Sequence, residues 1–537
     1  MADIALPGLI EPARVGPNLD SGFNPITAII FAGVIGCGIL FVAYSIYTDM
    51  NAAGTRVSEY LPFMLLFVAL LIALGFEFVN GFHDTANAVA TVIYTHSLPA
   101  SFAVVWSGMF NLAGVLWSSG AVAFGIISLL PVELILQVGS SAGFAMVFAL
   151  LIAAIIWNVG TWSFGLPASS SHTLIGSVIG VGVTNALLHG RSGTSGVDWD
   201  QAVSIGKALL FSPIFGFVLA GILLFAVKFI IPKRELFAEP KGNEPPPIWI
   251  RGTLVLTCTL VSFFHGSNDG QKGMGLIMLI LIGTVPTAYA LNRAMPPSQV
   301  AQFEATSQAA SAVIGAKAAG YDVLGDPRPA VTLYVAQHKI NEGTYPSLAV
   351  LVGDIAKEVT AYGSIALMPV EKVGNTRNDM YLASEAIRNL MKDKESDLSA
   401  ADVATLNAYK KSLDNATKFI PSWVKIVVAI ALGLGTMVGW KRIVVTVGSK
   451  IGKTHLTYAQ GACAEITAAA TIAAADGYGL PVSTTHVLSS GIAGTMAANS
   501  SGLQLATIRN IALAWVLTLP AAMVIAGALY LIFSHLF

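Results

Sequence analysis

The sequence predicts an all-α integral membrane protein, and three observations lead to that fold class: its composition, its long apolar runs, and a set of motifs that occurs twice. Of the 537 residues, 55% are hydrophobic and 11% are charged, whereas about a quarter of the residues in a soluble domain are charged. The net charge is only -1. Since no overall field attracts nucleic acid, any anion must be recognised at a local site.

The apolar runs are the second observation. They lie at 26–47, 61–94, 102–130, 144–164, 203–231, 248–282, 423–440 and 512–537. About 20 apolar residues cross a bilayer as a helix, and several runs exceed that length, so we expect about 9–12 membrane segments. Glycine, proline and polar residues interrupt the runs at 80–87, 165–172, 264–272 and 479–486. Irregular backbone at membrane depth occurs where protein or a watery cavity satisfies it, and the breaks therefore predict an interior site.

The breaks form two pairs, which is the third observation. GFHDTANA at 81–88 aligns without gaps with GSNDGQKG at 266–273, and GLPASSSH at 165–172 aligns with GLPVSTTH at 479–486. Both kinds of motif occur in the same order in each half. Interrupted apolar segments at corresponding positions of two repeats are typical of secondary transporters that bind their substrate near the bilayer midplane. We therefore expect an inverted-repeat transporter with broken transmembrane helices and two re-entrant hairpins.

The domain organisation follows from the repeats. We expect an N-terminal segment with the first transmembrane helix at 1–59, transporter repeat 1 at 60–232, and the start of repeat 2 at 248–291. A polar extramembrane insert at 292–420 follows, and the remainder of repeat 2 is at 421–537. Basic residues cluster in 233–251 and 441–453, which predicts that both loops are cytoplasmic. The insert is then outside, and the halves run in opposite directions.

The two Gly-Leu-Pro motifs predict an anion site. Proline suits the first turn of a helix, so a helix should begin after Pro167 and after Pro481. Its free N–H groups and positive dipole end attract anions. The hydroxyl groups of 169–171 and 483–485 would complete a cradle for a tetrahedral oxyanion. The alternative is that these residues only cap two ordinary helices.

Asp84 and Asp269 are candidates for coupling. A carboxylate inside a membrane costs roughly 3 kcal/mol or more and usually belongs to an ion or proton path; the alternative is a pair buried for packing specificity. Asn87 of the first motif is replaced by Lys272 in the second. If that ammonium occupies a cation site, coupling favours protons over sodium. Lys272 can also contact the anion, or reach an aqueous mouth.

Three further residues are candidates for proton transfer. His172 and His486 end the two Gly-Leu-Pro motifs and titrate in the physiological range, although each can equally form hydrogen bonds only within its hairpin. Glu465, like Glu77, lies in an apolar stretch and can act as a relay or cavity group.

At these motifs the chain resembles the inorganic phosphate transporter (Pit) family, specifically its bacterial low-affinity members. The residues that resemble it are NGFHDTANAVAT at 80–91, GLPASSSH at 165–172, FHGSNDGQKG at 264–273 and GLPVSTTH at 479–486. The resemblance implies an inverted-repeat symporter that imports phosphate, driven in bacterial members by protons, with phosphate taken as a neutral complex with a divalent metal. Archaeal and animal relatives use sodium. Lys272 departs from the asparagine of the sodium-coupled relatives.

The predicted function is therefore import of phosphate by proton symport across the inner (plasma) membrane by a multi-pass protein that is not an enzyme. The alternatives are a sodium-coupled phosphate symporter, a sulfate permease and an anion channel. A hydrolase that uses a serine and the histidine of 169–172 is disfavoured, because the hydroxyl groups occur in both halves and those of 169–172 lie in no Gly-x-Ser-x-Gly elbow. Predicted partners are phosphate, protons or sodium, and the lipid bilayer, without nucleic acid; a homodimer stays open. We expect no tightly bound cofactor, a divalent cation travelling with phosphate, and an unknown metal site.

The candidate residues form two overlapping sets. The phosphate-binding set is Ser169, Ser170, Ser171, Ser483, Thr484, Thr485, Asp84, Asn87, Asp269 and Lys272. The set for the coupling ion or proton is Asp84, Asn87, Asp269, Lys272, Glu465, His172 and His486.

Overall fold

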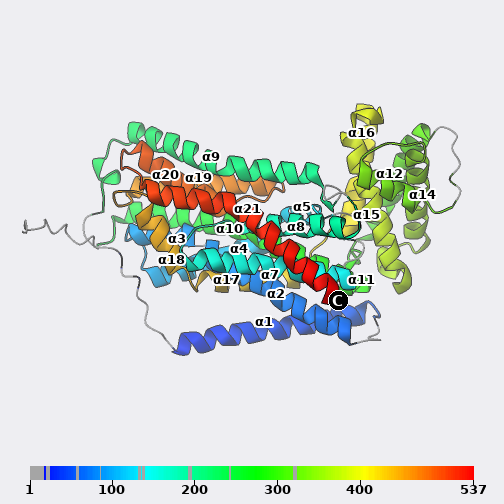
Figure 1. Cartoon of the computed structure of the whole chain (residues 1–537), viewed down its shortest axis with the longest axis horizontal. Helices are drawn as coiled ribbons and strands as arrows, with labels where there is room; N and C mark the ends of the chain where they lie inside the picture. Colours follow the sequence, from blue (N-terminus) through cyan, green and yellow to red (C-terminus); the bar gives the residue numbers. More distant parts are fainter. Residues whose placement is uncertain are drawn as a thin grey trace, which may run out of the picture.

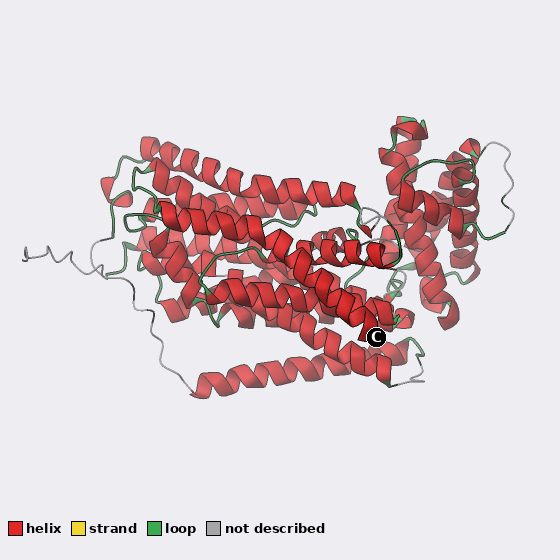
Figure 2. Cartoon of the chain, viewed as in Figure 1, coloured by secondary structure: helices red, strands yellow, loops and turns green. Residues whose placement is uncertain are grey.

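The computed structural model is all-helical, as predicted (Figures 1 and 2). It describes residues 17, 19, 25–55, 60–84, 86–130, 135, 140–191, 196–240, 244–318, 323 and 325–536. Within these residues the one β-type pairing is an isolated bridge between Gly452 and Leu503. The helices form a long body with a smaller bundle at one end.

The long body consists of fourteen labelled helices. They are α1 (Pro25–Ala52), α2 (Leu61–Asp84), α3 (Ala86–Tyr94), α4 (Ala100–Trp117), α5 (Ala121–Ile127), α7 (Ser141–Ser163), α8 (Ser170–Leu188), α9 (Trp199–Ile230), α10 (Ile248–Thr284), α17 (Ser422–Thr436), α18 (Lys441–Val445), α19 (Tyr458–Gly477), α20 (Thr484–Ala498) and α21 (Leu505–Leu536). In the described part of the chain, eight helical segments are long and apolar enough to cross a membrane, or nine if the bent pair Ala400–Thr417 and Ser422–Thr436 counts as one. The chain is therefore a multi-pass membrane protein, with eight or nine such segments where 9–12 were predicted.

The smaller bundle belongs to the insert. Its helices are α12 (Pro297–Lys317), α13 (Arg328–Gln337), α14 (Thr344–Ala361), α15 (Val370–Lys392) and α16 (Ala400–Thr417), and the short helix α11 (Pro286–Tyr289) precedes the insert. Arg388 of α15 joins the bundle to the long body through an ion pair of 2.5 Å with Asp198, the N-cap of α9. The structure leaves the predicted domain boundaries and the side of the insert as predictions.

The basic loops lie at the end of the body opposite to the insert. The 37 residues of α10 separate the loop at 233–251 from the insert, and a helix of that length extends roughly 55 Å. Figure 1 places α18, which opens the second basic stretch, at the same far end. This arrangement agrees with a cytoplasmic location for both loops and the opposite side for the insert.

Helices of each half pack against helices of the other half. Helix α4 of the first half packs against α10 of the second, while α17 of the second packs against α2 of the first. In the same way α8 contacts α21, and α20 contacts α9. A pair of repeats related by a two-fold axis produces this pattern. That the repeats are inverted stays a prediction.

Glycines at equivalent positions bring these helices close together. A Cβ atom on Gly81 would lie 2.3 Å from the carbonyl oxygen of Leu432, and one on Gly266 would lie 2.1 Å from that of Asn111. These are the leading glycines of the two Asp motifs. Only glycine permits such a close backbone approach, so its recurrence in both motifs has a packing reason.

Candidate functional site

The two Gly-Leu-Pro motifs fold alike. Gly165 and Gly479 both have φ of +66°, a conformation that favours glycine. Ser169 caps α8 by accepting a hydrogen bond of 3.2 Å from the N–H of His172. Ser483 caps α20 by accepting one of 3.2 Å from His486. The predicted helix starts are therefore present in both halves, and both serines act as caps.

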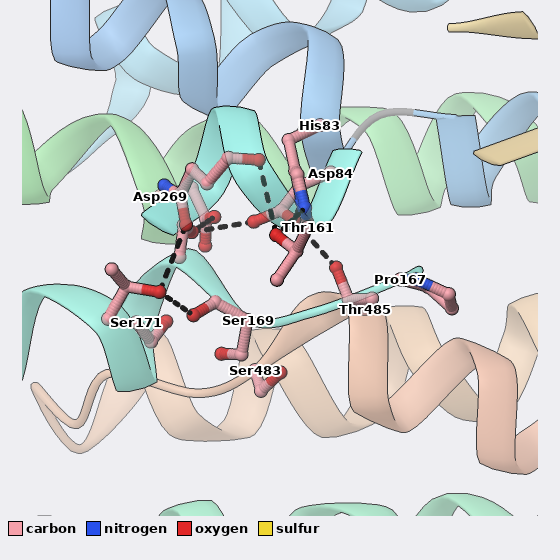
Figure 3. A network of polar contacts seen from close by, with 12 residues as sticks. His83, Asp84, Thr161, Pro167, Ser169, Ser171, Asp269, Ser483 and Thr485 are labelled. Carbon is pink, nitrogen blue, oxygen red and sulfur yellow. Dashed lines mark hydrogen bonds and ion pairs between the residues drawn. The ribbon is translucent and has the colours of Figure 1, made fainter. Parts of the chain in front are cut away.

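Asp84 lies between the two helix starts (Figure 3). It is the last residue of α2 and is buried. Ser170 of α8 donates a hydrogen bond of 2.6 Å to its Oδ2, and Thr485 of α20 donates one of 2.7 Å to its Oδ1. His83 Nδ1 lies 2.9 Å from Oδ1. One carboxylate thus holds both helix starts together.

Asp269 lies in the middle of α10 and is fully buried. Lys272, one turn later on the same helix, places its Nζ 2.7 Å from Asp269 Oδ2 and donates a hydrogen bond of 3.1 Å to Ser170 Oγ. Ser170 therefore connects the ammonium to Asp84. Lys272 is also fully buried, so it does not reach an aqueous mouth in this conformation.

The remaining hydroxyl groups of the helix starts have different partners. Ser171 donates to the carbonyl oxygen of Val482 at 2.9 Å, which ties the two motifs together. The buried Oγ1 of Thr484 has no hydrogen-bond partner among the described residues. The side chain of Asn87 lies outside the part of the chain that the structure describes.

His172 and His486 meet at the back of the helix starts. Their ring centroids are 4.6 Å apart, and His486 stacks on Trp515 at 4.1 Å. Trp515 in turn donates a hydrogen bond of 2.9 Å to the carbonyl oxygen of Pro167. The ring contacts of the two histidines are those of packing between the motifs.

Glu465 belongs to a different cluster. It is fully buried on α19 and accepts hydrogen bonds from Thr91 and Thr257. Both carboxylate oxygens are therefore satisfied by hydroxyl groups. Glu465 does not join the Asp84–Asp269 cluster by any described hydrogen bond.

Two histidines at the site were not among the predicted residues. His83 lies 3.1 Å from Thr161 Oγ1 on its Nε2 side, and His265 Nε2 lies 3.4 Å from Asp269 Oδ2. His265 Nδ1 is 2.9 Å from Asn111 Oδ1. A signal existed in the sequence, because His83 adjoins Asp84 and His265 precedes Asp269 by four residues, one helical turn.

The arrangement suits a cation and an oxyanion together. Ligand atoms of Asp84, His265 and Asp269 lie within 4.8 Å of one another, and carboxylates and imidazole are ligands for divalent metals. Helix N-termini and hydroxyl groups donate to oxyanions, and Lys272 adds an ammonium. The cluster thus holds groups of both kinds within a short distance.

Comparisons with known proteins identify the family of the chain. The low-affinity inorganic phosphate transporter PitA of Escherichia coli K12 is 42% identical over 487 residues, which cover 87% of this chain and 96% of PitA. PitB of the same organism is 40% identical, with 91% and 98% covered. A solved chain titled "The sodium-dependent phosphate transporter" has 18% identity and a TM-score of 0.48, with 88% of this chain and 100% of that chain covered. The model of the phosphate transporter family (PHO4) matches residues 80–526, and the chain belongs to that family.

Proposed function

We propose that the chain imports inorganic phosphate by symport with protons, and that phosphate enters as a neutral complex with a divalent metal. The observation that supports this most directly is the buried cluster in which Ser170 connects Asp84, Asp269 and Lys272. The relatives named above are phosphate transporters. Phosphate is thus the expected oxyanion at this cluster.

The charges of the cluster support a metal complex as the cargo. Two carboxylates would repel a bare phosphate, whereas a metal ion between them and the phosphate turns both interactions into attractions. Asp84 and Asp269 would hold the metal side of the complex. The N-terminal ends of α8 and α20, with Thr484 as an unpartnered donor, would hold the phosphate oxygens.

Lys272 supports protons as the coupling ion. Its ammonium lies 2.7 Å from Asp269, where a sodium ion would otherwise neutralise the carboxylate. With that position filled by the ammonium of Lys272, the neighbouring carboxyl and imidazole groups, namely those of the two aspartates with His83 and His265, are left to bind the coupling proton. His172, His486 and Glu465 stay candidates for its path.

Uptake of radiolabelled phosphate into proteoliposomes tests the proposal. An inward proton gradient with Mg²⁺ present should drive uptake, and a sodium gradient alone should not. Asp84→Asn and Asp269→Asn should each lower the rate by about a hundredfold, as expected for residues on an intramembrane ion path. Asp354→Asn on the exposed face of α14 is the control and should behave as wild type.

Three outcomes contradict the proposal. Uptake that requires sodium would identify a sodium-coupled symporter, and sulfate uptake at the same rate would identify a general oxyanion permease. Phosphate flux without any ion gradient dependence would identify a channel.

A further inference from the structure

Glu77 is a third acidic residue near the site, and the mechanism above does not use it. It lies on α2, two turns before Asp84, and its exposed fraction is 0%. Its Oε1 has no hydrogen-bond partner among the described residues. Its Oε2 accepts only a long bond of 3.5 Å from Asn80. An acidic side chain so poorly satisfied inside a membrane protein is costly unless it has a functional partner.

The side chain of Glu77 lies against the residue that follows Lys272. A Cβ atom on Gly273 would lie 2.2 Å from Cγ of Glu77 and 2.5 Å from its Oε1. Because Gly273 has no side chain, the carboxyl group of Glu77 fits at this place. Lys272 and Asp269 are the charged groups that act on Glu77, and the backbone N–H of Gly273 also interacts with its carboxyl group.

In the alignment of the two repeats, Glu77 and Lys272 occupy different positions. With Gly81 aligned on Gly266, the counterpart of Glu77 is Ser262, and the counterpart of Lys272 is Asn87. Each half thus departs from the other by one charged residue. One departure adds an acid and the other adds a base, and the fold packs the acid against Gly273, the residue that follows the base.

In its present position, Lys272 occupies one of the two carboxylate oxygens with which Asp269 would bind the metal of the cargo. Its Nζ binds Asp269 Oδ2 and Ser170 Oγ, so Asp269 cannot coordinate a metal with that oxygen until the ammonium leaves. An ammonium that leaves a buried carboxylate without finding another is strongly disfavoured. The long flexible stem of lysine allows a short movement to a second acceptor.

We propose that Glu77 is this second acceptor. When the metal-phosphate complex binds Asp269, the ammonium of Lys272 moves to the unpartnered Oε1 of Glu77, and it returns to Asp269 when the cargo is released. Two carboxyl groups share one ammonium in this scheme. Glu77 is a positioning residue that acts through Lys272, and the inference rests on the proposed function.

A double-mutant cycle tests the inference. Wild type, Glu77→Gln, Lys272→Gln and the double variant are purified in nanodiscs, and phosphate binding is measured by calorimetry with and without Mn²⁺. Glu77→Gln should weaken Mn²⁺-dependent phosphate binding about tenfold, because Lys272 then stays on Asp269. In the Lys272→Gln background the same change should alter binding by less than about twofold, since coupled residues are non-additive.

An equal effect of Glu77→Gln in both backgrounds would assign Glu77 a structural role only and overturn the inference. Thermal unfolding and size-exclusion profiles establish that each variant is folded. Glu77→Asp, which keeps the carboxylate, provides a second variant and should retain binding between that of wild type and Glu77→Gln. If wild type itself binds phosphate without any effect of Mn²⁺, the proposed cargo is wrong, which is a different result from an additive cycle.

Discussion

Asp84 and Asp269 occupy equivalent positions of the two repeats, yet their surroundings differ. Asp84 accepts hydrogen bonds from Ser170 and Thr485, one from each helix start. In a symmetric site the counterparts of these residues, Thr484 and Ser171, would donate to Asp269. Instead Thr484 Oγ1 has no partner in the described part of the chain, and Ser171 donates to Val482. Asp269 has Lys272 in their place.

The difference teaches what a single charged substitution does to a duplicated site. A charge-assisted hydrogen bond is stronger than one from a neutral hydroxyl group, so Lys272 displaces the hydroxyl groups from Asp269. Of the two, the hydroxyl group of Thr484 is then available to a ligand, since it has no partner among the described residues. The asymmetry thus assigns separate tasks to the halves: Asp84 fixes the helix starts, and Asp269 exchanges its partner.

Removal of the lysine should have the largest effect on this asymmetry. Lys272→Asn restores the residue found at the equivalent position, Asn87, and leaves Asp269 without its cation. Since breaking a buried ion pair costs about 3–5 kcal/mol, we expect proton-driven phosphate uptake to fall at least about a hundredfold. A sodium gradient should then stimulate the remaining uptake, because an alkali ion can occupy the vacated position.

Lys272→Arg is the matched control for this prediction. It keeps the charge but changes the geometry, so uptake should fall without any stimulation by sodium. Sodium stimulation in both variants, or in neither, would contradict the assignment of Lys272 to a cation position.

Equivalent substitutions in the two halves should destabilise the packing equally, although the site itself is asymmetric. Gly81→Ala and Gly266→Ala each place a methyl group against backbone of the partner repeat, 2.3 Å and 2.1 Å from a carbonyl oxygen. Overpacking of this kind costs about 1–3 kcal/mol, and both variants should unfold at clearly lower temperature in a thermal-shift assay. Gly160→Ala, whose Cβ would meet nothing within 4 Å, should not. A lower unfolding temperature for only one of the two variants would mean that the repeats pack differently.

Much of the fold and part of the site could be predicted from the sequence. Composition and apolar runs indicated the membrane helices, and the repeated motifs indicated the starts of α8 and α20 and put Asp84 and Ser170 in one candidate site. These features depend on local chain chemistry. The contact of Ser171 with Val482 of the other Gly-Leu-Pro motif could not be predicted, because it depends on how the two repeats pack together. Glu465 shows what the sequence could not predict: its position in an apolar stretch did not reveal that its partners are Thr91 and Thr257.

The smallest expected effect distinguishes two equivalent hydroxyl groups. Ser170 connects Asp84 to Lys272 before any ligand binds, and hydrogen bonds to charged groups contribute about 1.5–3 kcal/mol. Ser170→Ala should therefore lower the maximal uptake rate about tenfold. Thr484 lacks a protein partner, so Thr484→Ala should leave the maximal rate within about twofold and raise KM for phosphate about fivefold, the loss of one ordinary hydrogen bond. Equal changes in rate and KM for both variants would show that the two helix starts act alike, and that the asymmetry created by Lys272 does not reach the hydroxyl groups.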